Sequence, residues 1–446
     1  MKVSLPKGTR DFLPEEVFKR EYIFSTIRET FETYGYLPIQ TPSMENLSTL
    51  TGKYGDEGDN LLFKVLNNGD YLKKANLEAY ENKDSKKLTS SISSRGMRYD
   101  LTVPFARFVV MHQNEIAFPF KRYQIQPVWR GDRPQKGRYQ EFYQCDADVV
   151  GSDSLMYEAE LVQIFDTVFF KLKMDVTIKI NNRKILNGIA EVAGIAEHFQ
   201  AFTVSIDKLD KIGMDKVKQE MLKKGIPTSS LDLIANLLEI KTLDGLEEAL
   251  KGSEIGLLGV QELRTFHKYA DTKKLNSTIE FDITLARGLN YYTGCILEVK
   301  SNEVEIGSIA GGGRYADLTG VFGLKDVSGV GISFGAARIF DCLEELNRYP
   351  DSTSSKLKIM FLSFNDTNHH FAFKQVNKLR SAGISTDIYP SPIKFQKQMK
   401  YANKTKVPYI AIIGDEEMDS GILSIKHMET GTQEKLTIDE LIEKLS

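Results

Sequence analysis

The sequence predicts a protein of mixed α and β structure, with an α+β core on an antiparallel sheet, a helical insertion in that core, and a C-terminal α/β domain. Residues 120–150 alternate apolar and polar side chains in two runs joined by a polar loop, which is typical of a long β-hairpin. Residues 182–270 carry helical spacing instead, and residues 356–446 alternate strand and helix patterns. A chain of 446 residues is also too long for one compact core, so several domains are expected.

Composition and charge exclude two classes of protein. Hydrophobic residues make up 41% of the chain and charged residues 27%, which is typical of a folded protein and not of a disordered one. The net charge of -3 excludes a uniformly basic nucleic-acid coat. It leaves RNA binding open, because phosphate attraction depends on local patches of lysine and arginine.

The three cysteines, Cys145, Cys295 and Cys342, are too few and too scattered for a disulfide framework or a structural zinc site, so no metal site is expected. The first residues are charged and contain proline where a secretion signal needs an apolar run, and no later segment is long enough to span a bilayer. We therefore expect a cytoplasmic protein with reduced cysteines and no membrane partner.

The N-terminal region begins with a predicted helix over residues 18–34, where apolar residues recur at helical spacing and Gly35 is placed to end the helix. A strand bracketed by prolines is expected over residues 37–41. Residues 66–97 are rich in Lys, Asn, Ser and Glu and have little apolar periodicity. They are therefore interpreted as an exposed insertion, partly helical or mobile.

The predicted hairpin of residues 120–150 is followed by a helix over residues 154–172, with Ser152 or Asp153 as its cap. Residues 182–270 then read mainly as short helices. The expected helices within that insertion include residues 184–192, 214–223 and 231–238.

Strands resume at residues 279–285 and 294–299, and a linker is expected at residues 349–355, which contain Pro350 and three serines. After the linker, strands are expected at 359–364, 386–388, 409–414 and 423–427, and helices at 371–381, 394–403 and 438–445. The expected domain boundaries are residues 1–348 for the core, 182–270 for the insertion within it, and 356–446 for the C-terminal domain.

Polar side chains share one face of the second hairpin strand. Phe142, Gln144, Asp146 and Asp148 point to the same side, because strand side chains repeat every two residues. A solvated face is the commoner reason for such a pattern. The sequence therefore allows this face to line either solvent or a pocket.

Four cations lie around the hairpin loop, namely Arg130, Arg133, Lys136 and Arg138. Guanidinium groups match phosphate oxygens, so this cluster is suited to a polyphosphate or an RNA backbone. A solvated loop often carries a similar run of charges. The cluster alone does not decide between the two interpretations.

Further candidate residues lie later in the chain. Arg287 and Arg338 extend the pattern of arginines near glycine. Residues 311–315 lack both the P-loop lysine and the dinucleotide-binding spacing, so close packing against a helix explains them equally well. His369 and His370 lack further ligands at metal spacing and are interpreted as residues of a helix start or of the surface.

Five longer motifs occur in the order Pro6-Lys7-Gly8-Thr9-Arg10-Asp11, Tyr99-Asp100-Leu101-Thr102, Trp129-Arg130-Gly131-Asp132-Arg133-Pro134-Gln135-Lys136-Gly137-Arg138-Tyr139, Ala286-Arg287-Gly288-Leu289-Asn290-Tyr291-Tyr292-Thr293-Gly294 and Gly311-Gly312-Gly313-Arg314-Tyr315. In sequence and in order they resemble the motifs of histidyl-tRNA synthetases, a family of class II aminoacyl-tRNA synthetases. The resemblance covers nearly the whole chain. Five separated matches outweigh the alternative readings of each motif alone.

The resemblance implies that the chain activates histidine with ATP and Mg²⁺ and transfers it to the 3′ end of tRNA(His). Arg130 matches the class II arginine on the ATP α-phosphate, Arg338 in the segment 331–338 matches the arginine near the γ-phosphate, and Arg138 should assist at the outer phosphates. Arg287 should face the α-phosphate from the other side, where relatives use a metal ion. Arg130 and Arg287 are the implied catalytic residues. No protein nucleophile is needed, because such a site positions reactants and offsets phosphate charge.

The resemblance also implies a site for the amino acid. Asp100, Thr102 and Gln144 match positions that hold the amino and carboxylate groups of the substrate, and Asp148 and Tyr292 match the pair that holds the imidazole. The full implied set of histidine-binding residues is Asp100, Thr102, Gln144, Asp148, Arg287, Tyr291 and Tyr292.

The same resemblance assigns partners to whole segments. The first helix and strand should form a homodimer interface, residues 182–270 should approach the tRNA acceptor stem, and residues 356–446 should be the anticodon-binding domain. Three features depart from the usual pattern: Asn290 stands where an aspartate is common, Asp148 resembles the archaeal and eukaryotic type, and residues 66–97 are enlarged. They leave the lineage and the role of the enlarged segment open.

Two other functions explain parts of the sequence. The regulatory subunit of ATP phosphoribosyltransferase binds histidine on the same core, but such proteins typically lack the C-terminal domain that residues 356–446 provide. A stand-alone RNA-binding protein leaves the motif that contains Arg287 unexplained.

Overall fold

The computed structural model describes residues 3–52, 55–270, 274–286, 292–350 and 356–446. The chain divides into two compact units. The larger unit contains Met1–Asp11 and Arg20–Arg348, and the smaller contains Phe12–Lys19 and Tyr349–Ser446. Among the described helices, none combines the length and the apolar character needed to cross a membrane.

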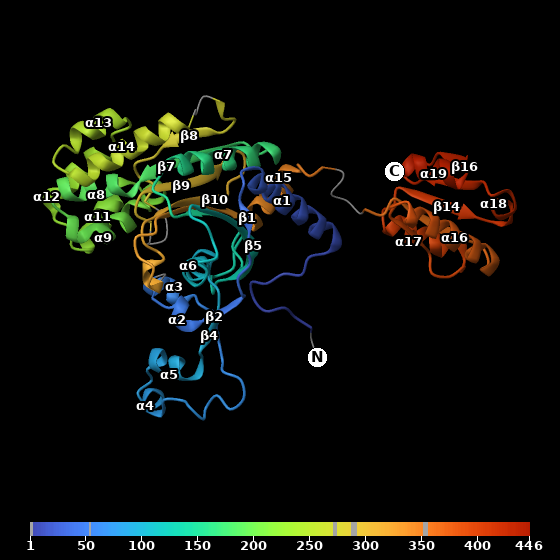
Figure 1. The fold of residues 1–446 in the computed structure, drawn as a ribbon, viewed down its shortest axis with the longest axis horizontal. Coiled ribbons are helices and arrows are strands. Elements are labelled where there is room, and N and C mark those ends of the chain that lie inside the picture. The colour runs from blue at the N-terminus through green and yellow to red at the C-terminus, as the bar shows by residue number, and fades with distance from the viewer. Residues whose placement is uncertain (1–2, 53–54, 271–273, 287–291, 351–355) are drawn as a thin grey trace. The chain divides into compact units, whose positions relative to one another are not determined.

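An eight-stranded sheet forms the centre of the larger unit (Figure 1). Its strands, in spatial order, are β1 (Leu37–Pro38), β5 (Phe120–Trp129), β6 (Glu141–Val150), β11 (Gly329–Gly335), β10 (Ala310–Tyr315), β9 (Cys295–Ser301), β7 (Val176–Asn182) and β8 (Thr278–Phe281). The predicted hairpin is β5 and β6, and every pairing from β5 to β7 is antiparallel. Within the described part of this eight-stranded sheet, only the two edge pairings, β1 with β5 and β7 with β8, are parallel.

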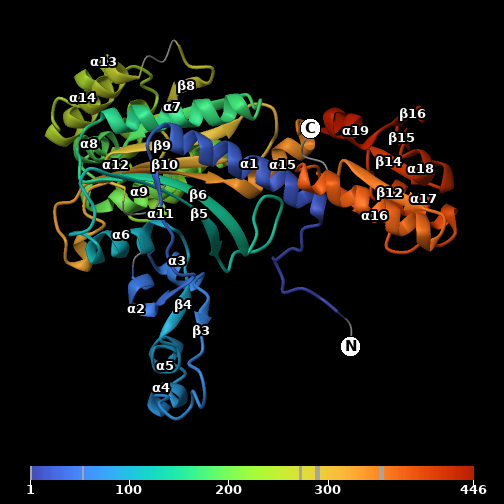
Figure 2. The same ribbon diagram turned by 45° about the vertical axis from the view of Figure 1, so that its right-hand side comes forward.

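Helices α1 (Pro14–Thr33) and α7 (Met156–Lys171) lie along one face of this sheet, and α15 (Ala336–Leu346) follows β11 (Figure 2). Aromatic rings join these elements. The ring centre of Phe334 on β11 lies 5.9 Å from that of Phe31 and 5.1 Å from that of Phe165. Odd-numbered residues of β6 such as Cys145 share this buried face, which leaves the even-numbered polar residues on the other one.

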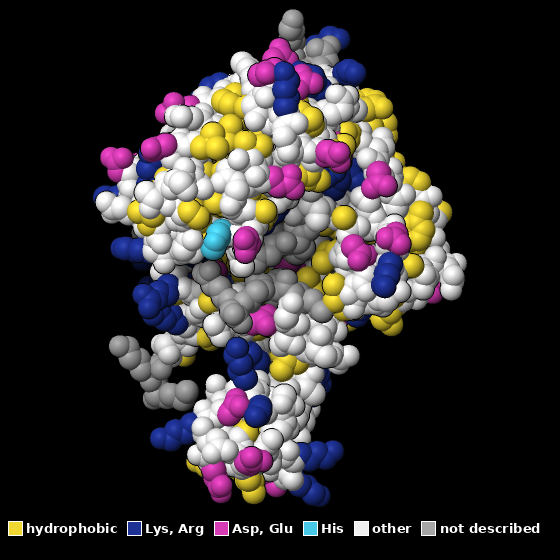
Figure 3. Space-filling model, turned by 90° about the vertical axis from the view of Figure 1, so that its left-hand side faces the viewer, with side chains coloured by type: hydrophobic (Ala, Val, Ile, Leu, Met, Phe, Trp, Pro, Cys, Tyr) yellow, Lys and Arg dark blue, Asp and Glu magenta, His cyan; other side chains and the backbone are white. Residues whose placement is uncertain are grey.

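The opposite face of the sheet is approached by α6 (Thr102–Met111) and by a small sheet of β2 (Met44–Asn46), β4 (Arg95–Met97) and β3 (Lys64–Val65). Short helices α2 (Leu47–Leu50) and α3 (Gly55–Asn60) flank it. The predicted exposed insertion projects from β3 and β4 and contains α4 (Leu77–Glu81) and α5 (Ser85–Ile92), which has no buried residue. Figure 3 shows basic and acidic side chains mixed on this lower lobe, so the face in view is not of one charge.

The predicted helical insertion is present between β7 and β8 (Figure 1). Its helices are α8 (Arg183–Val192), α9 (Phe199–Ile206), α10 (Leu209–Ile212), α11 (Met214–Lys223), α12 (Thr228–Leu238), α13 (Leu243–Ala249) and α14 (Glu254–Tyr269), with a 3₁₀ turn at Ala196–His198. Helices α8 and α14 pack backbone against backbone, because a Cβ at Gly188 would lie 2.5 Å from Cα of Gly256. A second 3₁₀ turn, Gly320–Phe322, precedes β11.

The smaller unit has its own five-stranded sheet. In spatial order its strands are β13 (Thr386–Ile388), β12 (Ile359–Ser363), β14 (Tyr409–Ile413), β15 (Leu423–His427) and β16 (Gln433–Leu436), and its helices are α16 (Asp366–Ser381), α17 (Phe395–Lys404), α18 (Asp415–Ser420) and α19 (Ile438–Leu445). Val376 of α16 and Leu441 of α19 pack on one face of the sheet, and Ala402 of α17 packs on the other. The sequence did not predict α18 or β16, which are short and polar.

Three local predictions need correction. The strand expected over residues 37–41 spans only Leu37–Pro38. Helix α7 begins at Met156, and its N-cap, Leu155, makes no side-chain capping bond, so neither Ser152 nor Asp153 is the cap. Helix α1 begins at Pro14, four residues before the predicted start. Its first turn is stabilised because the backbone N–H of Leu13 donates to Glu16 at 2.8 Å, in addition to the preference of proline for the first helical position.

All three cysteines are buried and free in the structure. Burial raises the pKa of the Cys145 and Cys295 thiols well above the ordinary value and raises the pKa of Cys342 to about 12. They are reduced, apolar-like residues of the core, as cysteine commonly is when buried.

Candidate active site

A cavity of about 380 Å³ lies on the polar face of the large sheet. Cavities of this size hold small-molecule ligands in many proteins. The lining brings together five of the residues that the sequence singled out. These are Arg130, Arg138, Gln144, Tyr292 and Arg338.

Arg130 follows β5 and is fixed by two aromatic rings. Its Cζ lies 4.3 Å from the ring centre of Tyr99 and 5.2 Å from that of Phe142. Its Nε donates a hydrogen bond to the carbonyl oxygen of Tyr99 at 3.0 Å. The contacts hold a permanent positive charge at the cavity wall and tie it to the Tyr99-Asp100 segment.

Arg338, in the first turn of α15, joins the hairpin loop to the cavity. Its Nε donates to the carbonyl oxygen of Gly137 at 3.1 Å, and its Nη1 donates to the carbonyl oxygen of Ser308. Gly137 has a φ of +68°, which favours glycine, and a Cβ here would also crowd Arg338, lying 3.0 Å from its Cγ.

The other loop cations are divided between the cavity and the surface. Arg138 lines the cavity with its Nη1 3.8 Å from Oδ1 of Asp132. Lys136 instead forms a 2.7 Å ion pair with Glu345 at the surface. Neither Lys136 nor Arg133 is among the described residues that line the cavity.

The floor of the site is a ladder of facing residues on three strands. Gln144, Asp146 and Asp148 of β6 lie opposite residues of β5 and β11 on the same face. From one end to the other, the three rows are Gln126, Gln144 and Gly335, then Gln124, Asp146 and Ser333, then Arg122, Asp148 and Gly331.

Glycine makes room at the third row. A Cβ at Gly331 would lie 2.0 Å from Oδ1 of Asp148, and a Cβ at Gly313, its partner on β10, would lie 2.9 Å from the ring of Tyr292. Side chains at either position would collide with the residues above them. Gly313 therefore makes room for Tyr292, whereas the nearest atoms to a Cβ at Gly311 or Gly312 belong to the adjacent strands β9 and β11 and not to a helix.

Asp148 is buried with a relative exposure of 2%, so it is no solvated strand residue. Its Oδ2 forms a 2.7 Å ion pair with Nη2 of Arg122, and its Oδ1 accepts a hydrogen bond from the hydroxyl of Tyr315 at 2.9 Å. Burial raises the pKa of Asp148, while Arg122 and the Tyr315 hydrogen bond act in the opposite direction. Arg122 lies in turn 4.1 Å from the ring centre of Phe105 on α6.

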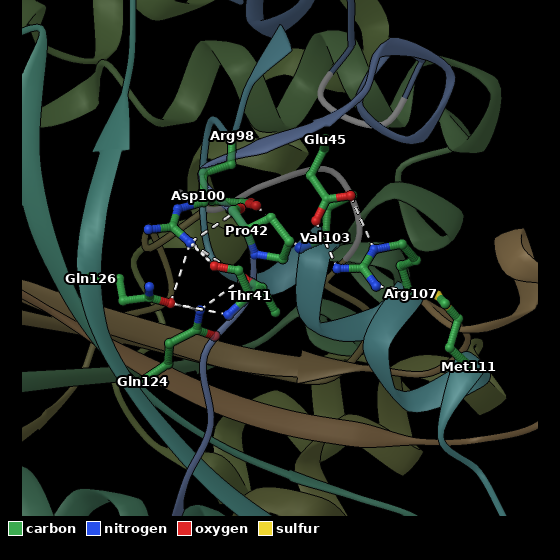
Figure 4. A network of polar contacts seen from close by, with 10 residues as sticks. All are labelled: Thr41, Pro42, Glu45, Arg98, Asp100, Val103, Arg107, Met111, Gln124 and Gln126. Atoms are coloured by element: carbon green, nitrogen blue, oxygen red, sulfur yellow. Dashed lines mark hydrogen bonds and ion pairs between the residues drawn. The ribbon is translucent and has the colours of Figure 1, made fainter. Parts of the chain in front are cut away.

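Arg98 organises the segment that leads to Asp100 (Figure 4). It is fully buried, and burial lowers its pKa to about 10. Its Nη1 donates to the carbonyl oxygen of Thr41 at 2.7 Å and to Oε1 of Gln126 at 3.2 Å, and its Nε donates to the carbonyl oxygen of Pro127 at 2.8 Å. One guanidinium thus ties β4, β5 and the chain after β1 together beside the cavity.

The remaining predicted residues are placed differently. Asp100 is buried, and its Oδ1 accepts a hydrogen bond from the backbone N–H of Val103 at 3.1 Å, at the start of α6 that Thr102 opens. Among the described residues that line the cavity, Asp100, Thr102 and Asp148 are absent. Arg287 and Tyr291 lie outside the described residues.

Sequence reasoning did not place Arg122, Gln124 or Tyr315 in the site. Arg122 and Gln124 lie two residues apart on β5, which was the available signal for a shared face. Nothing in the sequence alone gives the register that sets Arg122 opposite Asp148. Tyr315 lies 167 residues after Asp148 in the sequence, so only the tertiary structure brings its hydroxyl to that carboxylate.

Comparison with known proteins identifies the family of this site. The histidyl-tRNA synthetase family model matches residues 8–72 and 70–339, and an anticodon binding domain model matches residues 356–446. The chain belongs to the histidyl-tRNA synthetase family. The match covers every described residue that lines the cavity.

Relatives of similar length extend across both units. The histidine–tRNA ligase of Christiangramia forsetii is 55% identical over 448 residues, covering 99% of this chain and 98% of that protein. The histidine–tRNA ligase of Phocaeicola vulgatus is 54% identical, covering 99% and 98%. Both alignments include the C-terminal unit.

Solved structures show the same fold. The crystal structure of histidyl-tRNA synthetase from Nostoc sp. PCC 7120 has a TM-score of 0.83 and 31% identity, covering 100% of this chain and 99% of that one. An ATP phosphoribosyltransferase regulatory subunit/histidyl-tRNA synthetase from Bacillus halodurans C has a TM-score of 0.70 at 18% identity, covering 90% and 97%. The second likeness shows a shared fold alone. The predicted class, an α+β core with a helical insertion and a C-terminal α/β unit, is confirmed.

Proposed function

We propose that the chain is a histidine–tRNA ligase that activates histidine with ATP in the cavity on the large sheet and transfers it to tRNA(His). Family membership over nearly the whole chain is the observation that carries this function. The geometry agrees with it, because three arginines line the cavity together with the amide of Gln144 and the carboxylates of Asp132 and Glu298. Such a site suits a substrate that joins phosphates to an amino acid.

In the proposed reaction, the carboxylate of histidine attacks the α-phosphorus of ATP, and pyrophosphate leaves. A terminal ribose hydroxyl of the tRNA then takes the histidyl group from the adenylate, and AMP leaves. Arg130 and Arg287 stabilise negative charge that develops at the α-phosphate, and Arg138 and Arg338 bind the outer phosphates. The fixed contacts of Arg130 and Arg338 support these roles, because a preorganised cation stabilises charge without having to reorient.

Mg²⁺ fits the same cavity as a partner of the ATP phosphates. Asp132 and Glu298 line it together with the arginines. No cluster of three or more metal-ligating side chains occurs in the described part of the chain, but Mg²⁺ commonly uses one or two carboxylates with substrate phosphates. Asp132 and Glu298 would hold the ion, which would neutralise phosphate charge when bound.

The amino acid is proposed to lie along the polar face of β6. Asp100, Thr102 and Gln144 hold its amino and carboxylate groups, and Arg287 and Tyr291 complete the proposed histidine-binding set. Asp148 and Tyr292 hold its imidazole ring. The position of Tyr292 over Gly313, on the same side as Asp148, supports that pairing.

Partners are proposed for the remaining segments. Residues 1–348 form the catalytic core, residues 182–270 approach the tRNA acceptor stem, and residues 356–446 bind the anticodon, which the match to an anticodon binding domain supports. The working form is a cytoplasmic homodimer that contacts through α1 and β1. Leu37 at the outer strand of the sheet is exposed, which supports an interface there.

The decisive experiment is histidine-dependent exchange of pyrophosphate into ATP by the purified chain. Exchange should require L-histidine and should be absent with other amino acids. A chain that binds histidine but shows no exchange would be a regulatory paralogue, and the proposed function would be wrong.

A further inference from the structure

The middle row of the sheet floor contains two acceptor atoms that face no donor. Within the part of the chain that the structure describes, Oε1 of Gln124 and Oδ1 of Asp146 are buried without a hydrogen-bond partner. The two residues are paired directly across β5 and β6. Both are almost inaccessible, with relative exposures of 1% and 2%. Adjacent buried acceptors are costly unless a donor reaches them.

The neighbours of this pair provide no such donor to the two atoms. The amide nitrogen of Gln124 donates to Oγ1 of Thr41 at 2.8 Å and to Oε1 of Gln126, which fixes the orientation of the amide group. Ser333, opposite Asp146 on β11, donates to its carboxylate. Ser333 of the same row and Gln144 of the adjacent row line the cavity, so Asp146 lies between cavity-lining residues although it is not itself among the described residues that line the cavity.

We propose that Asp146, oriented by Gln124, is a specificity-determining residue that accepts an N–H group from the imidazole ring of bound histidine. The inference rests on the proposed function and adds a residue to the amino-acid pocket. Asp146 lies two residues from Gln144 on the same face, about 7 Å along the strand by the rise of a β-strand. A bound histidine can span this distance, with its amino and carboxylate groups at Gln144 and its ring at Asp146.

The state of Asp148 supports this assignment. Both of its oxygens are already engaged, one by Arg122 at 2.7 Å and the other by Tyr315 at 2.9 Å. Asp146 has an oxygen with no such partner among the described residues. An imidazole N–H that enters the pocket can therefore donate to the unpartnered oxygen of Asp146. On Asp148 it would have to share an oxygen that already binds Arg122 or Tyr315.

The charged groups around Asp146 are also consistent with a carboxyl group that has no hydrogen-bond donor for one of its oxygens. The pKa of Asp146 is raised to about 7 in total, chiefly because the group is buried. Asp148 on the same strand and Asp100 ahead of α6 also raise it, while Arg122 on β5 and the hydrogen bond with Ser333 act in the opposite direction. The protonated acid carries the missing donor and can give it to Oε1 of Gln124. When an imidazole N–H replaces that proton, Asp146 ionises and the proton passes to solvent.

The test compares two ligands in the full-length protein with Asp146→Asn. L-Histidine is set against β-(pyrazol-1-yl)-L-alanine, which keeps the amino group, the carboxylate and the ring size but has no ring N–H. The dissociation constant of each is measured by calorimetry. In the natural protein we expect histidine to bind more tightly, and in the variant we expect that preference to shrink about 10- to 100-fold, the size of one charge-assisted hydrogen bond.

Three other outcomes are informative. Equal weakening of both ligands would assign Asp146 to the α-ammonium group and overturn the imidazole contact. An unchanged preference, with intact folding and normal ATP binding, would show that Asp146 is only a buried structural acid. If Asp146→Asn does not fold, Asp146→Ser replaces it in the same comparison.

A matched control is Asp166→Asn, which alters another buried carboxylate of the core. Asp166 lies on α7 and accepts hydrogen bonds from the Asn276 side chain and from the backbone N–H of Ser277. It should leave the ligand preference unchanged. Absence of histidine-dependent exchange in the natural protein would defeat the proposed function, whereas exchange together with an unaltered preference in Asp146→Asn would defeat this inference alone.

Discussion

Asp148 on β6 and Gly331 on β11 are directly paired, and a Cβ at Gly331 would lie 2.0 Å from Oδ1 of Asp148. The carboxylate has little freedom to move, because Arg122 and Tyr315 hold its two oxygens. A methyl group at this position therefore acts directly on the proposed imidazole site.

Gly331→Ala should raise the KM for histidine by at least about tenfold and lower the thermal midpoint, because overpacking forces the carboxylate or a strand to shift. Pyrophosphate exchange and thermal unfolding measure the two effects. Gly252→Ala is the control, since its Cβ would meet only Cγ2 of Val192 at 3.9 Å. Equal behaviour of the two variants would refute the proposed crowding.

Asp148→Asn should weaken the use of histidine strongly and leave the KM for ATP nearly unchanged, because the ATP phosphates are assigned to Arg130 and Arg338. It should also destabilise the fold by roughly 3 kcal/mol, since the buried Arg122 loses its ionised partner. The dependence of pyrophosphate exchange on each substrate is the measurement. An unchanged response to histidine would reject the role of Asp148.

Arg287→Ala should reduce the rate of adenylate formation severely and affect histidine binding much less. An interaction made chiefly with charge developing at the α-phosphate contributes to turnover more than to affinity. Single-turnover kinetics and histidine calorimetry on the same variant separate the two quantities. Near-normal turnover would contradict the catalytic assignment.

A chain ending at Tyr349 should retain histidine-dependent pyrophosphate exchange and charge tRNA poorly. The larger compact unit ends at Arg348, so the cavity and its walls remain in the shortened chain. Exchange and aminoacylation assays, with tRNA binding measured in parallel, test both halves of the expectation. Unchanged tRNA affinity would show that residues 356–446 do not bind the anticodon.

Asp146→Asn should change how stability depends on pH. The folded-state pKa of Asp146 is raised from its ordinary 3.8 to about 7, so its protonated form stabilises the fold below pH 4, and that contribution is lost as the pH rises toward 7. Relative to the variant, the natural protein should therefore lose stability between pH 4 and pH 7. Denaturant midpoints of both proteins at pH 5 and pH 8 give the difference, and a difference that does not vary with pH would refute the raised pKa.

Much of the fold was predictable because its periodicities are local. The alternation in residues 120–150 predicted β5 and β6, and the strands and helices of residues 356–446 follow the predicted order. Prediction from local sequence patterns failed where an element has no capping side chain or no apolar alternation. Leu155 caps α7 without a side-chain bond, and β16 is polar, so neither carried a recognisable signal.

The site was predictable only in part. Family motifs named the arginines that line the cavity, and strand periodicity put Gln144, Asp146 and Asp148 on one face. The partners of those residues depend on register and on long-range contacts. Arg122 reaches Asp148 only because β5 and β6 pair as they do, and the open acceptor on Asp146 is visible only when its neighbours are known.

The three cysteines have a practical consequence for experiments on this chain. Each thiol is buried and its pKa is raised, so each is a poor nucleophile toward maleimide in the folded protein. Two cysteines, one introduced at an exposed position of each unit, would then be labelled selectively without removal of the natural three. One dye in each unit would make their separation observable by fluorescence energy transfer during the charging cycle.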